Sequence, residues 1–134
     1  MMTFLLILPW KNLQKSHHDC GFLACVREAG GVVRAQWNDS KQITFKGRID
    51  LVTQTDLAVE RLLVSGLPGL LPGSTVLAEE SHASLDPGDL TWIVDPVDGT
   101  TNYAHGLPMV AVSATFSASK VSGQLCSALV TAPS

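Results

Sequence analysis

The sequence predicts an α+β fold in which two helices pack on a mostly antiparallel sheet of about four or five strands. Apolar residues recur at helical spacing before residue 66, and short runs with strand character follow residue 74. Hydrophobic residues make up 46% of the chain and charged residues 16%, a balance that excludes a disordered protein. At 134 residues, the chain has the length of one domain or of half a larger one.

The first predicted helix covers residues 17–37. Its apolar stripe consists of Phe22, Val26, Ala29 or Gly30, Val33 and Trp37. Gly30 and Gly31 each weaken this helix by about 1 kcal/mol relative to alanine. We expect these paired glycines to let another helix approach closely.

The second predicted helix begins after Thr53. Asp56 follows three residues later, so the two form a capping box with the shorter acid in place of glutamate. We expect this helix to end near residues 65–66, because Pro and Gly then alternate through a predicted loop at residues 66–73.

The strand signals are short and mostly lie in the second half of the chain. Strands are predicted at residues 43–45, 74–78, 92–94, 110–116 and 125–132, with a turn at 119–123 that makes the last two a hairpin.

The strand at residues 92–94 leads directly into a cluster of polar residues. Proline disfavours ladder pairing, so the strand is predicted to end at Asp95, before Pro96. Gly99 then opens a short helix, whose first N–H groups have no partner within the helix. Asp95 and Asp98 offer the oxygen ligands that Mg²⁺ prefers, and a helix start offers N–H groups to phosphate.

Two other interpretations of this stretch compete with a metal or phosphate site. A turn with an N-cap aspartate needs no function, because Asp, Pro and Gly are common in turns. A phosphatase with a covalent aspartyl-phosphate would need a nucleophilic aspartate two residues before Asp98. That position is Pro96, which cannot attack phosphorus, so this mechanism is disfavoured.

The string Asp-Pro-Val-Asp-Gly-Thr-Thr-Asn-Tyr at residues 95–103 resembles the metal-binding motif of the inositol monophosphatase family, within a Mg²⁺-dependent, lithium-sensitive phosphatase superfamily. Two further stretches resemble the same family: Asp-Leu-Val-Thr-x-Thr-Asp, which ends at Asp56, and Glu-Glu-Ser, which begins at Glu79. Ala78 stands where the family usually has glycine.

The resemblance extends from about Gly21 to Pro133, which corresponds to the first half of the usual family chain. It implies the N-terminal half of an inositol monophosphatase-like sugar-phosphatase fold. Residues 17–134 would form its metal-binding part, and residues 1–16 would be an extension outside the family pattern. The later family stretch, with an aspartate that completes the second metal site and residues that grip the sugar-alcohol ring, is absent.

The resemblance also implies a role for each matching residue. Glu79, Asp95 and the carbonyl of Val97 would hold one Mg²⁺, and Asp95 would bridge to a second ion that Asp98 also binds. Phosphate would be held around residues 97–100, with N–H groups from Gly99 and Thr100. The catalytic residues would be Asp56, Thr100 and Glu79, of which Asp56 and Thr100 orient the attacking water.

The implied activity is hydrolysis of a phosphate monoester, first of all inositol monophosphate, by metal-activated water without a covalent intermediate. Two alternatives stay open. The chain is a catalytically incompetent fragment that self-associates or pairs with a full-length relative, or it is a related phosphatase for fructose bisphosphate, histidinol phosphate or phosphoadenosine phosphate. Asn102 and Tyr103 favour the inositol branch.

Composition restricts the partners and the compartment. The net charge is −3 without a basic block, which argues against nucleic acid. The apolar residues 1–10 are too few to span a bilayer and lack the charged start of a signal peptide. Three cysteines without metal-ligand spacing indicate reduced thiols in the cytoplasm. We expect a homodimer or other self-association, because an open sheet edge invites pairing.

Overall fold

The computed structural model describes residues 4–7, 17–48, 50–78, 89–118 and 127–131. Three helices and seven strands follow one another in these residues: β1 (Phe4–Ile7), α1 (His17–Ala35), β2 (Ile43–Lys46), β3 (Asp50–Thr53), α2 (Gln54–Leu70), β4 (Thr75–Ala78), β5 (Leu90–Asp98), α3 (Thr100–Ala104), β6 (Ala111–Ala118) and β7 (Ser127–Thr131). No helix among the described residues is both long and apolar enough to cross a bilayer.

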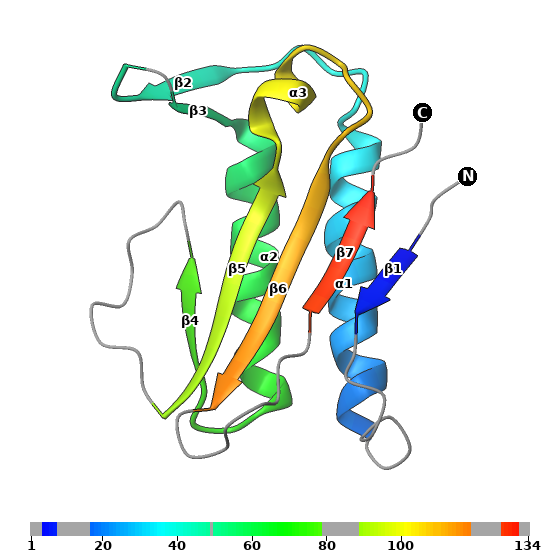
Figure 1. Ribbon diagram of the computed structural model, residues 1–134, viewed down its shortest axis with the longest axis vertical. Helices are drawn as coiled ribbons and strands as arrows, with labels where there is room; N and C mark the ends of the chain where they lie inside the picture. The colour runs from blue at the N-terminus through cyan, green and yellow to red at the C-terminus, as the bar shows by residue number, and fades with distance from the viewer. Residues whose placement is uncertain (1–3, 8–16, 49, 79–88, 119–126, 132–134) are drawn as a thin grey trace.

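The main sheet has five strands in the order β1-β7-β6-β5-β4. The β4–β5 pair is parallel, and the other three neighbouring pairs are antiparallel. Figure 1 shows α1 and α2 together behind this sheet, with the β2–β3 hairpin and α3 at one end of the molecule. The predicted α+β class, with two long helices on a mostly antiparallel sheet, is confirmed.

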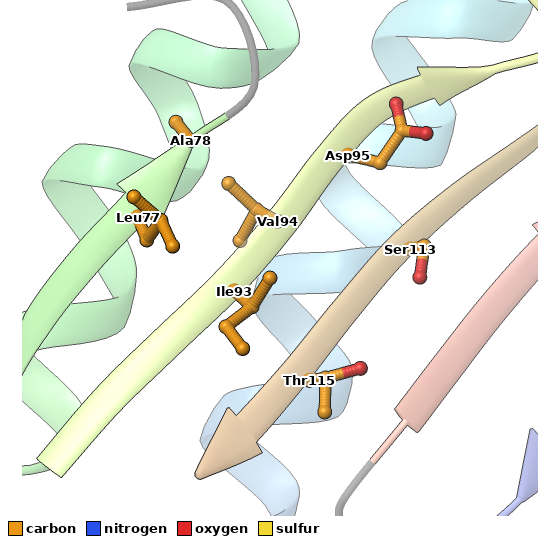
Figure 2. Close-up of a pocket in the computed structure, with 7 residues that line it drawn as sticks. All are labelled: Leu77, Ala78, Ile93, Val94, Asp95, Ser113 and Thr115. Atoms are coloured by element: carbon orange, nitrogen blue, oxygen red, sulfur yellow. The ribbon is translucent and has the colours of Figure 1, made fainter. Parts of the chain in front are cut away.

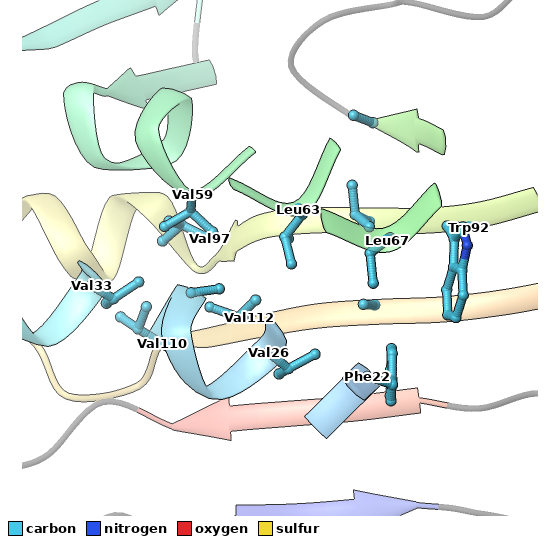
Figure 3. Packing of buried hydrophobic residues seen from close by; sticks show 14 of the residues in the cluster. Phe22, Val26, Val33, Val59, Leu63, Leu67, Trp92, Val97, Val110 and Val112 are labelled. Atoms are coloured by element: carbon cyan, nitrogen blue, oxygen red, sulfur yellow. The ribbon is translucent and has the colours of Figure 1, made fainter. Parts of the chain in front are cut away.

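The hydrophobic core lies between the two long helices and the sheet (Figure 3). The predicted stripe of α1 faces it, because Phe22, Val26, Ala29 and Val33 are all buried. Phe22 stacks on Trp92 of β5 with ring centroids 5.4 Å apart. The two helices therefore pack against one face of β5, and the side chains on its other face point away from them.

Helices α1 and α2 approach each other closely at Gly21 and Gly66. A Cβ on Gly21 would lie 2.6 Å from Leu70 Cδ2, and one on Gly66 would lie 2.8 Å from Cys25 Sγ. A Cβ on Gly31 would meet nothing within 4 Å. The expectation was therefore wrong for Gly31 and stays a prediction for Gly30, and the close contact at Gly21 and Gly66 uses one glycine from each helix.

The predicted end of α2 near residues 65–66 was also wrong. The helix continues through Gly66 and Pro68 to Leu70. Leu67 is fully buried and extends the face of Leu63, one turn earlier. Burial of a leucine contributes about 2 kcal/mol, which offsets much of the local cost of glycine and proline in a helix.

Two pairings had no clear signal in the sequence. Strand β3 pairs with β2 in a separate two-stranded sheet, although only β2 was expected. Strand β1, which lies within the expected extension of residues 1–16, pairs antiparallel with β7 at the edge of the main sheet. The predicted turn at residues 119–123 lies outside the described residues.

Candidate active site

Strand β5 continues past the proline at which it was expected to end. It runs from Leu90 to Asp98 and includes Pro96. Asp95 pairs with Ser113 and Asp98 pairs with Ala111, so three steps along β5 correspond to two along β6. This offset is a β-bulge, which is one of the few places where a sheet accepts proline.

The bulge places Asp95 and Asp98 on the same face of the sheet. In a regular strand, residues three apart point to opposite faces. Cross-strand partners share a face, however, and Ser113 and Ala111 are two residues apart on β6. Figure 2 shows the Asp95 carboxylate at one end of a row of side chains on this face.

A shallow cavity of about 410 Å³ lies beside Asp95. Its lining consists of Leu77, Ala78, Ile93, Val94, Asp95, Ser113 and Thr115 (Figure 2). Asp98 borders a second cavity of about 410 Å³, which Gly99, Asn102 and residues 108–111 complete. Asp95 is half-buried and Asp98 is exposed, so both acids border hollows that are open to solvent.

The start of α3 requires glycine. Gly99 is the N-cap with φ 89°, in the left-handed region. A Cβ at this position would also lie 2.7 Å from the Met109 carbonyl oxygen. That oxygen accepts a hydrogen bond from Asn102 Nδ2 at 3.0 Å. The chain after the bulge is thus held against the start of β6 without a side-chain cap on α3.

The predicted capping box at the start of α2 is confirmed. The Thr53 amide donates to Asp56 Oδ2 at 2.9 Å, and the Asp56 amide donates to Thr53 Oγ1 at 3.4 Å. The Thr53 hydroxyl also donates to Asp56 Oδ2. The Asp56 side chain is almost fully buried, with 1% exposed.

Thr100 connects Asp56 to the bulge. Its hydroxyl lies 2.8 Å from Asp56 Oδ1 and 2.9 Å from the Val97 carbonyl oxygen, with good donor geometry toward both. Asp56 and Thr100 are 44 positions apart in the sequence. The structure therefore brings together the matched stretches that end at Asp56 and begin at Asp95.

A second hydrogen bond between α2 and α3 was not predicted from the sequence. Thr55 Oγ1 lies 2.9 Å from the Tyr103 hydroxyl, and both side chains are fully buried. Burial raises the pKa of Tyr103 above its usual value, with smaller opposing and reinforcing effects from Thr55, Asp56 and Asp39. No local sequence pattern predicts this contact, because the two residues are 48 positions apart.

The structure describes only some of the acidic residues that could hold a metal ion. Glu79 lies outside the described residues. Within the described part of the chain, no three His, Cys, Asp or Glu side chains gather closely enough to hold a metal ion. Asp95, Asp98 and the carbonyl of Val97 are hard oxygen donors, which is the chemistry that Mg²⁺ prefers.

The model of the inositol monophosphatase family matches residues 16–133. The chain belongs to this family. It is 44% identical over 91 residues to inositol monophosphatase 1 of Solanum lycopersicum, which covers 65% of this chain and 33% of that protein. It is 42% identical over 99 residues to inositol monophosphatase 1 of Sus scrofa, with 70% and 36% covered.

Solved structures show the same likeness. The extragenic suppressor protein suhB of Bartonella henselae superimposes with a TM-score of 0.74 at 28% identity, over 86% of this chain and 45% of that one. An inositol monophosphatase of Thermotoga maritima gives 0.72 at 27% identity, over 86% and 44%. The chain thus spans roughly a third of the two plant and animal relatives and less than half of these structures.

Proposed function

We propose that this chain carries the catalytic core of a Mg²⁺-dependent phosphate monoesterase, with inositol monophosphate as the first candidate substrate. The observation that carries the proposal is the contact of 2.8 Å between Thr100 Oγ1 and Asp56 Oδ1. It joins two family motifs at the end of β5, beside two acids that share one face of the sheet.

The metal ligands would be Glu79, Asp95, the Val97 carbonyl and Asp98. The donor set of the described members fits Mg²⁺, since all are oxygen atoms. When bound, the ion would neutralise charge on the phosphate oxygens and lower the pKa of a coordinated water. The bulge supports this assignment because it turns Asp95 and Asp98 toward one side of the sheet.

Asp56 and Thr100 would accept the proton of the attacking water. As the water oxygen bonds to phosphorus, a Thr100 lone pair would take the proton while the Thr100 hydroxyl passes its own to Asp56 Oδ1. The bond from phosphorus to the alcohol oxygen would break, the departing alkoxide would take a proton from a solvent water molecule, and Asp56 would return its own proton to solvent. Thr53 keeps Asp56 in place through Oδ2, so Oδ1 faces Thr100.

Phosphate would be held beside residues 97–100. Gly99, the N-cap of α3, has no side chain and therefore offers no capping oxygen to the first N–H groups of the helix. Phosphate would reach these N–H groups from the N-cap side. Pro96 occupies the position where a covalent phosphatase would need its nucleophile, which supports direct attack by water.

A second candidate is a fragment without independent turnover. The matching stretches of the 134 residues correspond to 33% and 36% of the plant and pig relatives. Tested by themselves, these residues would supply the ligands of one metal site and would hold the ring only through phosphate. We propose self-association as a homodimer, or pairing with a full-length relative, in the cytoplasm. The free thiol of Cys25 suits a reducing compartment.

The experiment is phosphate release from inositol monophosphate by the purified chain against Mg²⁺, with and without Li⁺, alongside light scattering and Mg²⁺ titration calorimetry. Asp95→Asn should abolish any metal-dependent release and weaken Mg²⁺ binding by about tenfold or more. Asp39→Asn, which removes an exposed carboxylate near the end of α1, is the control and should change neither.

Metal-dependent release would support the first candidate, and full activity from a monomer would exclude the incomplete-enzyme alternative. Mg²⁺ binding without turnover would support the second. Equal Mg²⁺ affinity of the Asp95→Asn variant and the unchanged chain would contradict the metal assignment under both candidates.

A further inference from the structure

We infer that Tyr103 is a positioning residue for the proposed hydrolysis: its buried hydroxyl, acting through Thr55, sets the rotation of α3 and so aims the Thr100 hydroxyl at Asp56. This inference rests on the proposed function, since it assigns Tyr103 to the same proton path. The Tyr103 hydroxyl is hydrogen-bonded to Thr55 and not to Asp56, and Tyr103 lies outside the linings of the cavities beside Asp95 and Asp98, as far as the described residues go.

The direction of the Tyr103 hydrogen bond follows from the partners of Thr55. Thr55 Oγ1 donates to the side-chain oxygen of Gln36 at 2.7 Å, and a hydroxyl has one hydrogen to give. Thr55 therefore accepts from Tyr103 at 2.9 Å, and the Val33 carbonyl oxygen, at 3.5 Å, is the more distant acceptor for the same hydroxyl. The order of donation is Tyr103 to Thr55 to Gln36, which ties α3 to α2 and then to the end of α1.

Helix α3 needs such an anchor because it has only five residues. A single helical turn forms unfavourably without tertiary contacts. In the described part of the chain, two side-chain hydrogen bonds join α3 to α2. They come from Thr100 and Tyr103, one turn apart on α3, and reach Asp56 and Thr55, which are neighbours on α2. Rotation of α3 about its axis would stretch both contacts together, so the second bond fixes the geometry of the first.

The Tyr103 ring is held from two sides, which leaves its hydroxyl a defined direction. Trp37 packs against it edge-on, with centroids 5.3 Å apart. Lys41 Nζ lies 4.5 Å from the ring centroid and is itself bonded to backbone carbonyls at the end of α1. Because burial raises the pKa of Tyr103, the hydroxyl stays a proton donor at neutral pH.

The test removes the hydroxyl and leaves the ring. Tyr103→Phe keeps the packing against Trp37 and Lys41 but loses the bond to Thr55. Thr55→Val removes the acceptor at similar volume, and Thr55→Ser retains it. Ser74→Ala, which removes a half-buried hydroxyl that donates to the Leu71 carbonyl at the other end of α2, is the matched control.

The first readout is the ¹³C shift of the Asp56 side-chain carboxyl in the Mg²⁺-free chain, together with exchange of the residue 103 amide, which donates to the Gly99 carbonyl at 2.9 Å. Tyr103→Phe and Thr55→Val should move the Asp56 signal and speed the exchange about fivefold, the effect of losing one net hydrogen bond. Thr55→Ser and Ser74→Ala should resemble the unchanged chain.

The second readout is turnover. In an active chain, kcat should fall about fivefold in Tyr103→Phe while KM stays constant, because phosphate contacts are untouched. An unmoved Asp56 signal overturns the inference, and so does a moved signal with unchanged kcat. If the unmodified chain releases no phosphate, the proposed function fails for this chain, and the Asp56 signal alone decides whether Tyr103 positions the Thr100–Asp56 pair.

Discussion

Two helices begin side by side in this molecule, and their starts are built in opposite ways. Helix α2 begins with a complete capping box, in which Thr53 and Asp56 satisfy each other's backbone N–H groups. Helix α3 begins at Gly99, which has a positive φ and no side chain to offer. The Thr100–Asp56 contact joins the two starts.

The difference separates a start that has a side-chain cap from one that has none, and the proposed phosphate site uses the second. Unpaired N–H groups at a helix start need a partner, and a side-chain cap supplies one at the cost of blocking access. The α2 start uses its own acid in this way. The α3 start is shaped by backbone conformation and by contact with Met109, so its geometry depends on the fold around it.

The largest expected effect comes from adding a methyl group to the open start. Gly99→Ala should destabilise the protein by about 3 kcal/mol, because a positive φ is strained for alanine and the new Cβ would crowd the Met109 carbonyl. Gly73→Ala, at φ 85° with nothing within 4 Å of the new Cβ, should cost only about 1 kcal/mol. Urea unfolding measures both, and equal losses would contradict the importance of the Met109 contact.

A smaller effect is expected at the capped start. Thr53→Ala removes the side-chain cap and should lower the free energy of unfolding by about 1 kcal/mol. Thr53→Ser keeps the hydroxyl and should stay close to the unchanged protein. Denaturant midpoints at constant m-value provide the measurement; an alanine variant as stable as the serine variant would mean that Thr53 contributes nothing to the helix start.

The smallest effect concerns the residue that ties the two helices together. Tyr103 is the only tyrosine of the chain, so absorbance of tyrosinate reports it alone. Burial raises its pKa, so its folded midpoint should lie above the value of about 10 seen in denaturant. The associated stability is present below pH about 10 and is lost as pH rises through the folded pKa. Identical midpoints with and without denaturant would contradict this.

Features that depend on neighbouring residues could be predicted from the sequence, and features that depend on distant parts of the fold could not. The capping box depends on residues three apart, and it was predicted from spacing alone. The bulge in β5 depends on registration with β6, so Pro96 suggested a strand end instead. The end of α2 was missed because burial of Leu67 against the rest of the core outweighs the local preferences of Gly66 and Pro68.

The residues of the candidate site also differ in how far they could be predicted from the sequence. Asp56, Asp95, Asp98 and Thr100 were named from motifs, and the structure brings Asp56 to Thr100 and places the other two on one sheet face. Tyr103 entered the prediction only as part of the motif, because its partner Thr55 is distant in sequence. The place of Glu79 stays a prediction, since it lies outside the described residues.

The pairing of β1 with β7 has a consequence for the order of folding. These strands are the first and last described elements of the chain, yet they lie side by side in the sheet (Figure 1). Phe4 lies opposite Val130. During synthesis, β1 leaves the ribosome long before its partner exists, while β5 and β6 pair soon after they are made. Closing so long a loop carries the largest entropic cost in the sheet. Assembly should therefore proceed outward from β5 and β6, and β1 should be the last strand to dock and the first to exchange its amide protons.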